Sequence, residues 1–218
     1  MYVALIMASS FKNFIESLAG PKGPGPSTTF TMFHIYYALE LMAEKPIGRI
    51  KLAEKLNVGE GAIRTIVSRL KEAGLILTSR EGCKLTEKGL NIWKKFLDVF
   101  PKRGEIKKTA LTTSNYNYAF LVKNKGQKIG SGIDQRDAAI MGGARRALVI
   151  VVKNEHLMIE SVSNSIEEDF PEAANEIRDK FDVEDNDVII IAGAENATKA
   201  KRGAFAASWV LIGNSRKT

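Results

Sequence analysis

Apolar residues between positions 60 and 73 repeat at the spacing of a helix with one buried face. They fall at positions i, i+3, i+4 and i+7, so they form one stripe along a helix and leave polar residues on the other side. The stripe consists of Ile63, Ile66, Val67 and Leu70. Gly74 follows at a position where helices commonly end. The pattern predicts an amphipathic helix over residues 60–73.

Similar patterns, separated by prolines and glycines, predict the other elements of the first half. Residues 5–18 form a short amphipathic helix, and residues 20–26, rich in glycine and proline, form a linker. A helix over 28–44 follows, capped by Ser27 or Thr28, and then a helix over 48–56 with Ile50, Leu52, Ala53 and Leu56 inward. A turn at 57–59, with Gly59 at positive φ, leads into the helix over 60–73. After it come a hairpin of strands 75–79 and 83–85 and a helix from the Thr86 cap to about Phe100. This order of helices and hairpin is typical of a winged helix domain.

The second half alternates strand and helix patterns, which predicts a small α/β domain with one mixed sheet. The strands are expected at 106–113, 116–123, 147–153, 156–159 and 187–192, and the helices at 134–142, 167–181 and 197–212. The chain therefore divides into an N-terminal helix and linker over 1–26, a winged helix-turn-helix over 27–103, and an α/β regulatory or dimerisation domain over 104–218. The fold class is a two-domain α+β and α/β protein.

The excess positive charge lies entirely in the first half. The chain has a formal net charge of +7; residues 1–103 hold 16 Lys and Arg against 9 Asp and Glu, and residues 104–218 hold 16 against 16. A basic half joined to a neutral half fits a DNA-binding module with a regulatory module. A solvated, lysine-rich surface of the kind found in thermophile proteins would give the same count.

Composition excludes several other classes of protein. With 44% hydrophobic and 26% charged residues, the chain has ordinary globular usage. Cys83 is the single cysteine, so neither an intrachain disulfide nor a cysteine metal cluster can form, which fits a reducing compartment. The first residues lack the basic leader of a secretory signal, and no apolar run approaches the roughly 18 residues of a membrane helix. We expect a soluble, cytoplasmic protein.

Helical geometry assigns the outward side of helix 60–73 to DNA recognition. In a helix-turn-helix the second helix enters the major groove, where arginine can bond guanine and short hydroxyl side chains can bond bases or phosphates. The residues expected to contact bases are Gly61, Arg64, Thr65 and Ser68. The residues expected to contact the DNA backbone are Arg69, Lys71, Lys51, Lys55 and, in the hairpin, Arg80 and Lys84.

Two segments resemble winged helix-turn-helix transcriptional regulators. They are the run Ala62–Ile76, which ends in Leu-Lys-Glu-Ala-Gly-Leu-Ile, and the Leu-Thr-Glu-Lys-Gly after the hairpin. The resemblance covers residues 28–100. With Gln135-Arg-Asp-Ala-Ala included, the chain is similar to archaeal winged-helix proteins that carry a C-terminal domain of unassigned function. The resemblance implies double-stranded DNA as the partner and names no ligand. Some winged helices instead bind RNA or proteins.

Winged-helix regulators usually occupy two half-sites, which implies a homodimer. The N-terminal helix, or the last helix with Phe205, Trp209, Val210 and Leu211, supplies the contact, unless both belong to the core of their own chain.

The chain carries few residues suited to catalysis. His34 is expected to pack within a helix, His156 to be exposed at a hairpin, and Cys83 to be a strand residue whose thiolate Lys84 would favour. No motif indicates a metal, a cofactor or a catalytic site, so we expect no enzyme. A glycine-rich loop over 126–137 leads into a helix, and Gly130, Ser131, Gly132 and Arg136 form a candidate site for a small anionic effector. The alternative is that Gly126 and Gly130 make hairpin turns and that Asp134 caps the helix.

Two functions follow from these patterns. The first is a sequence-specific, ligand- or partner-responsive transcriptional regulator. The alternative is a small-molecule-binding protein or enzyme whose winged helix serves only for protein docking or dimerisation. The loop over 126–137 distinguishes the two functions. A small molecule that binds the C-terminal domain while DNA binding stays unchanged would favour the alternative.

Overall fold

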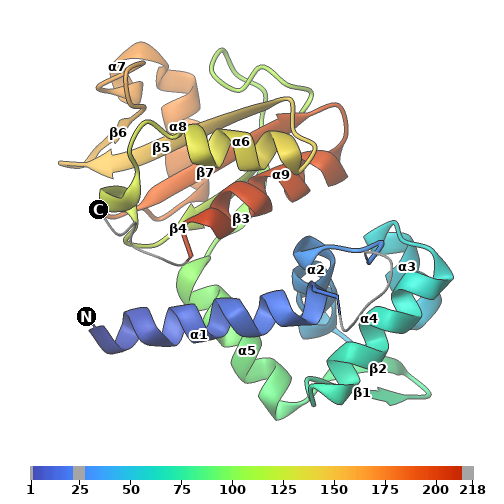
Figure 1. The fold of residues 1–218 in the computed structure, drawn as a ribbon. Coiled ribbons are helices and arrows are strands. Elements are labelled where there is room, and N and C mark those ends of the chain that lie inside the picture. The colour runs from blue at the N-terminus through green and yellow to red at the C-terminus, as the bar shows by residue number, and fades with distance from the viewer. Residues whose placement is uncertain (1, 22–27, 213–218) are drawn as a thin grey trace. The chain divides into compact units, whose positions relative to one another are not determined.

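The computed structural model describes residues 2–21 and 28–212, with side chains from Phe11 onward, and they form two compact units that divide between Phe96 and Leu97 (Figure 1). Residues 22–26 of the predicted linker over 20–26 and the Ser27 cap lie outside the described residues, as does the side chain of Leu5. None of the described helices has the length and apolar character needed to cross a membrane.

The first unit contains helices and one two-stranded hairpin, in the predicted order. Its elements are α1 (Tyr2–Ala19), α2 (Met32–Glu44), α3 (Arg49–Leu56), α4 (Glu60–Glu72), β1 (Ile76–Ser79), β2 (Gly82–Leu85) and α5 (Glu87–Val99), whose end belongs to the second unit. The strands pair antiparallel. Helix α1 packs into the unit through the buried side chains of Phe11, Ile15 and Leu18, and the Phe11 and Phe96 rings meet edge to face at 4.8 Å.

Helix α2 begins later than predicted, at Met32. Thr31 is its N-cap, and the Thr31 N–H donates to Nδ1 of the buried His34 at 2.9 Å. The predicted cap Thr28 instead donates its hydroxyl to the carbonyls of Ala19 and Phe30, each at 3.0 Å. Thr28 therefore ties the end of α1 to the segment before α2.

The turn between α3 and α4 uses a different residue from the one predicted. Asn57 has φ +52°, and Gly59 has φ −70° as the N-cap of α4. Asparagine tolerates the left-handed region because its short polar side chain bonds locally. The predicted Thr86 cap of α5 is confirmed, since its Oγ1 accepts the Gly89 N–H at 3.0 Å.

Ile50 does not face the core as predicted. Its exposed fraction is 80%, whereas Leu52 and Leu56 are buried. Leu52 and Leu56 are four residues apart and occupy one side of α3, and Ile50 lies about 200° around the helix from Leu52 at 100° per residue. The short helix has room for only one buried stripe.

The second unit is a five-stranded sheet covered by helices. Its elements are β3 (Arg103–Ile106), β4 (Tyr116–Val122), the 3₁₀ helix η1 (Gly126–Lys128), α6 (Ile133–Met141), β5 (Arg146–Lys153), β6 (His156–Met158), α7 (Ile166–Asp169), α8 (Pro171–Lys180), β7 (Val188–Ala194) and α9 (Ala197–Val210). The strand order is β3-β4-β7-β5-β6. Helices α6 and α9 cover one face, and α7 and α8 lie on the other (Figure 1).

The sheet is antiparallel at every described pairing, so the prediction of a mixed sheet is wrong. Strands β4 and β5 run in the same direction and are joined through α6, as in a β-α-β unit. The later strand β7 lies between them and pairs antiparallel with both. The local pattern indicates the crossover, and only the complete fold shows that another strand fills the gap.

Two predicted boundaries in this unit are also wrong. The strand expected at 106–113 is β3, which ends at Ile106 and is followed by a loop. The helix expected at 167–181 is broken between α7 and α8 at Phe170, which has φ −142° and ψ 61°. Pro171 explains the break, because proline disfavours a helical conformation in the residue before it and is itself well suited to a first helical turn.

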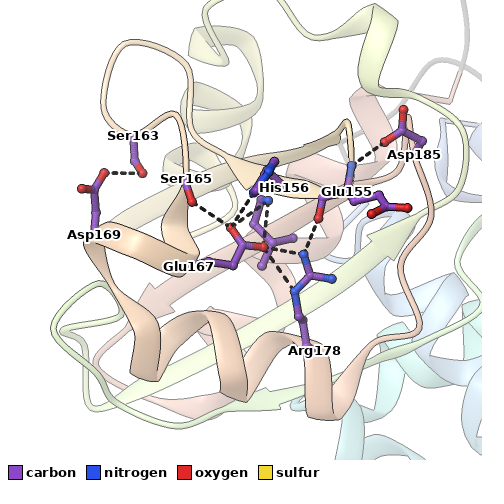
Figure 2. Close-up of polar contacts among 9 residues, drawn as sticks. Glu155, His156, Ser163, Ser165, Glu167, Asp169, Arg178 and Asp185 are labelled. Atoms are coloured by element: carbon purple, nitrogen blue, oxygen red, sulfur yellow. Dashed lines mark hydrogen bonds and ion pairs between the residues drawn. The ribbon is translucent and has the colours of Figure 1, made fainter.

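A polar cluster fixes β6 against α7 and α8 (Figure 2). The Glu167 carboxylate accepts the Leu157 N–H at 3.1 Å and the Arg178 Nε–H at 3.2 Å, and His156 Nδ1 lies 4.0 Å from it. Burial alone would raise the pKa of Glu167, but the hydrogen bonds from Arg178 and from backbone N–H groups outweigh it and lower that pKa. The cluster therefore stabilises the fold as an ion pair at neutral pH.

The two helices considered for dimerisation bury their large side chains within their own units. Phe205 and Trp209 of α9 stack with ring centroids 5.4 Å apart, and both are buried, as is Leu211. Val210 is 38% exposed. The described part of α1 and most of the apolar side of α9 belong to the cores.

Candidate nucleic-acid interface

Helix α4 has one buried and one exposed side, as the sequence predicts. Ile63, Ile66, Val67 and Leu70 are buried. The predicted contact residues that are exposed on this helix are Gly61, Arg64, Thr65, Ser68 and Lys71. They give the outward surface of α4 two cations and two hydroxyl groups, and Gly61 leaves the backbone accessible because nothing lies within 4 Å of the position of its missing Cβ.

The polar side chains of this surface bond along their own helix. Arg64 Nη2 lies 2.6 Å from Glu60 Oε1, and both side chains are more than 70% exposed. The Thr65 hydroxyl donates to the Gly61 carbonyl at 3.0 Å. Such exposed pairs are weak, so the side chains can exchange these partners for others at small cost.

Arg69 does not belong to this surface. The sequence predicts it as a backbone contact, but its exposed fraction is 7%. Its Nη1 donates to the carbonyls of Leu18 and Gly20 at 2.9 and 2.6 Å, and its guanidinium lies 5.2 Å from the centre of the Phe30 ring. Arg69 follows Ile66 by three residues on the buried side of α4, and it satisfies carbonyls at the end of α1 that the helix itself leaves unbonded.

A groove of about 530 Å³ runs between α4 and the hairpin. Its lining includes three predicted contact cations, Arg64, Lys71 and Arg80, together with Ser68. The other lining residues are Gly48, Arg49, Val67, Thr78, Ser79, Glu81, Gly82 and Cys83. Lys84 is exposed on β2 but does not line the groove.

Arg49 is a member of this surface that the sequence did not reveal. The residues before α3 pair with β2, since Ile47 and Cys83 exchange backbone hydrogen bonds of 3.0 and 2.8 Å. Gly82 permits this approach, because a Cβ there would lie 2.5 Å from the Ile47 carbonyl carbon. The pairing joins residues far apart in sequence, so no local pattern indicates that Arg49 lies beside the hairpin.

A second hollow, of about 910 Å³, lies between α3 and α4 and also includes Arg49 and Arg64. It is lined further by Ile50, Ala53, Glu54, Asn57, Val58, Gly59, Glu60 and Ile63. Lys51 and Lys55 are exposed on α3 but line neither hollow. Arg49 and Arg64 are thus the two cations shared by both concave surfaces.

Cys83 is a buried strand residue. Burial raises the pKa of its thiol, and the charge of Arg49 offsets only part of that increase. The predicted effect of Lys84 on the thiolate is therefore not what the structure shows, and Cys83 is unsuited to nucleophilic chemistry.

The glycine-rich loop of the second unit leads into α6, as the sequence predicts. Gly132 has φ +73° and lies against Val149, so it serves as the turn before α6. Of the residues predicted to bind an anion, Arg136 lines a cavity of about 330 Å³. Among residues 2–21 and 28–212, no group of three or more His, Cys, Asp or Glu could hold a metal ion.

Comparison with known proteins finds matching family models and similar solved structures. Residues 36–91 match the PH0730-like N-terminal domain, and residues 113–211 match a domain of unknown function, DUF4443. The hypothetical protein PH0730 from Pyrococcus horikoshii OT3 is similar in structure, with a TM-score of 0.70 and 29% identity over 84% of this chain and 92% of that chain. Lactococcus lactis ZitR matches with a TM-score of 0.29 and 26% identity over 45% of this chain and 74% of that chain. No curated protein matches.

Proposed function

We propose that this chain is a sequence-specific, double-stranded DNA-binding transcriptional regulator in which residues 28–100 form a winged helix-turn-helix. The observation that carries the proposal is the surface formed by α4 and the hairpin, where Arg49, Arg64, Lys71 and Arg80 line one groove. The role is one of binding, without a catalytic step, in the cytoplasm. The second unit senses a ligand or mediates assembly.

In the proposed complex α4 lies in the major groove. Arg64 donates two hydrogen bonds to guanine O6 and N7, and Thr65 and Ser68 bond neighbouring bases or phosphates. Gly61 allows the start of the helix to approach the DNA closely. Arg49, Lys71, Arg80 and Lys84 bind phosphates, and these contacts fix the position of the helix without reading sequence.

The proposed active form is a homodimer that binds two half-sites separated by about 34 Å or a multiple of it, one turn of the duplex. The buried apolar side chains of α1 and α9 leave other surfaces to form the contact between protomers.

Duplex binding is expected to weaken steeply with salt. Each phosphate neutralised by a lysine or arginine releases counterions, so four such contacts in each protomer of the dimer, eight in all, give a slope of log K against log salt of about −7. Gel-shift titrations of genomic fragments, including the promoter of the protein's own gene, at several salt concentrations measure it. If no fragment binds, or if affinity does not change with salt concentration, the proposal is wrong.

Replacing Glu60 by glutamine is expected to raise duplex affinity roughly two- to fivefold. The Glu60 carboxylate pairs with Arg64 at 2.6 Å and lies at the end of α4 that enters the groove, where it repels phosphate. The substitution frees the guanidinium and removes this repulsion. Fluorescence anisotropy with one labelled duplex measures the change. Glu87→Gln, which removes an exposed acid from the first turn of α5 outside both hollows, is the control and should leave affinity unchanged.

A further inference from the structure

The second unit contains a cavity of about 330 Å³ at the start of β5. It lies between the loop after β3, the helix α6, and the paired ends of β5 and β7, where Arg146 stands opposite Gly193. The cavity is lined by Leu111, Thr112, Thr113, Ser114, Asn117, Arg136, Ile140, Arg145, Arg146, Ala147, Leu148, Ile191 and Gly193. At roughly 30 Å³ for each water-sized group, it has room for about ten of them.

Three arginines and no carboxylate line this cavity. Arg136 and Arg145 each have one acidic partner outside the lining, since Arg136 pairs with Asp137 at 3.0 Å and Arg145 with Glu195 at 2.6 Å. Arg146 donates from Nη1 to the Thr113 hydroxyl at 3.0 Å and has no carboxylate partner among the described residues. The lining therefore keeps at least one uncompensated positive charge.

The polar wall of the cavity is held rigidly by the loop after β3. Thr109 and Thr112 bond one another through backbone and hydroxyl groups at 2.9–3.3 Å, and both are buried. The buried Asn117 amide donates to the carbonyls of Thr112 and Ser114 at 3.2 and 2.9 Å. Gly193 lets this loop approach, because a Cβ there would lie 2.7 Å from the Ser114 Cβ. A site whose wall is already ordered loses little entropy when it binds.

The remaining wall is apolar. Leu111, Ile140, Ala147, Leu148 and Ile191 contribute aliphatic side chains. A ligand that fits both walls carries one anionic group and a short aliphatic part, because guanidinium groups bind carboxylates and phosphates with paired hydrogen bonds.

We propose that this cavity binds a small aliphatic anion, a carboxylate or a phosphate ester, through Arg146 and its neighbouring arginines. The anion takes hydrogen bonds from Arg146 and Thr113, and the aliphatic part contacts Leu148 and Ile191. The inference names the site and the ligand class for the sensing role in the proposed function and rests on that role. The anion then lies away from Gly130, Ser131 and Gly132. Arg136 is the one residue of the predicted anion site in the loop over 126–137 that also lines this cavity.

Isothermal titration calorimetry on the full chain, without DNA, tests the inference. The probes are 4-methylpentanoate, butyl phosphate, inorganic phosphate and the neutral 4-methylpentanamide. We expect 4-methylpentanoate or butyl phosphate to bind, and the better of the two identifies the anionic group. The amide, which lacks the charge, should not bind, and inorganic phosphate, which lacks the apolar part, should bind more weakly.

Arg146→Gln is expected to lower the affinity for the probe about tenfold or more, because it removes the charge that has no acidic partner. Lys153→Gln, which removes an exposed cation from the far end of the same strand, is the matched control and should leave affinity unchanged. Thr113→Val, which removes the hydroxyl that accepts from Arg146, provides a second variant if Arg146→Gln fails to fold, and a several-fold loss of affinity there supports the same site.

Three results would overturn the inference. They are no heat with any anion, equal binding of the amide and the acid, or equal loss in the Lys153→Gln variant. If small anions fail and Arg146→Gln instead weakens duplex binding, the arginines contact DNA phosphate and the cavity is not a ligand site. Because the titration contains no DNA, failure of duplex binding alone leaves its result intact.

Discussion

Arg69→Ala is expected to destabilise the first unit by about 2–4 kcal/mol, the range for loss of a buried charged group that bonds two backbone carbonyls. The wild-type guanidinium bonds the carbonyls of Leu18 and Gly20 and lies over the Phe30 ring. Alanine removes all three contacts. The partly buried carbonyls at the end of α1 then lose the hydrogen bonds that Arg69 donates to them. The contact between α1 and α4 should be lost first, because these bonds join the two helices.

Hydrogen exchange measured by mass spectrometry locates this effect. Peptides from α1 should exchange much faster in Arg69→Ala than in the wild type. The guanidinium chloride concentration at which half of the first unit is unfolded should also fall. Arg69→Lys should recover only part of the loss, since an ammonium group cannot reproduce the planar guanidinium that lies over Phe30. Unchanged protection of α1 would mean that these bonds contribute little, and the assigned role of Arg69 would be wrong.

Arg64→Ala, five residues earlier in the same helix, should have the opposite profile. We expect unfolding to change by less than about 0.5 kcal/mol, because the side chain is exposed and its pair with Glu60 is weak. Affinity for the preferred duplex should fall by about 1–3 kcal/mol, roughly 5- to 150-fold, and discrimination at one base pair should relax.

Anisotropy titrations with the preferred duplex and with single-base variants of it measure this change. Lys71→Ala should weaken all duplexes alike and reduce the salt slope by about two, since one phosphate contact is lost in each protomer of the dimer. Lys95→Ala, an exposed cation of α5 outside both hollows, is the control for loss of charge. Loss of affinity that is equal for Arg64→Ala and Lys95→Ala would remove Arg64 from the proposed base contacts.

The two arginines show how far the sequence predicts the site. Periodicity placed the buried stripe of α4 correctly, so the exposure of Arg64 followed from helical geometry. The same geometry placed Arg69 on or near the outer face, and no local pattern reveals that the carbonyls of Leu18 and Gly20 lie within its reach. Such a contact depends on the packing of α1, about fifty residues earlier.

The same distinction holds for the fold. Helix ends set by local chemistry, such as the Thr86 cap and the Gly74 end, were predictable because neighbouring residues decide them. The position of β7 between β4 and β5 was not, since strand order depends on pairing between distant segments. The pairing of Ile47 with Cys83, which brings Arg49 to the groove, was missed for the same reason.

Sequencing of the genomic fragments captured by the full-length protein tests the central claim most directly. The proposal predicts enrichment of a shared motif with two related half-sites whose centres lie about 10 base pairs apart, or a multiple of that spacing. Arg64→Ala should capture fragments in which one position of the motif is relaxed. Capture of fragments in proportion to their abundance, with no shared motif, would contradict sequence-specific recognition by α4.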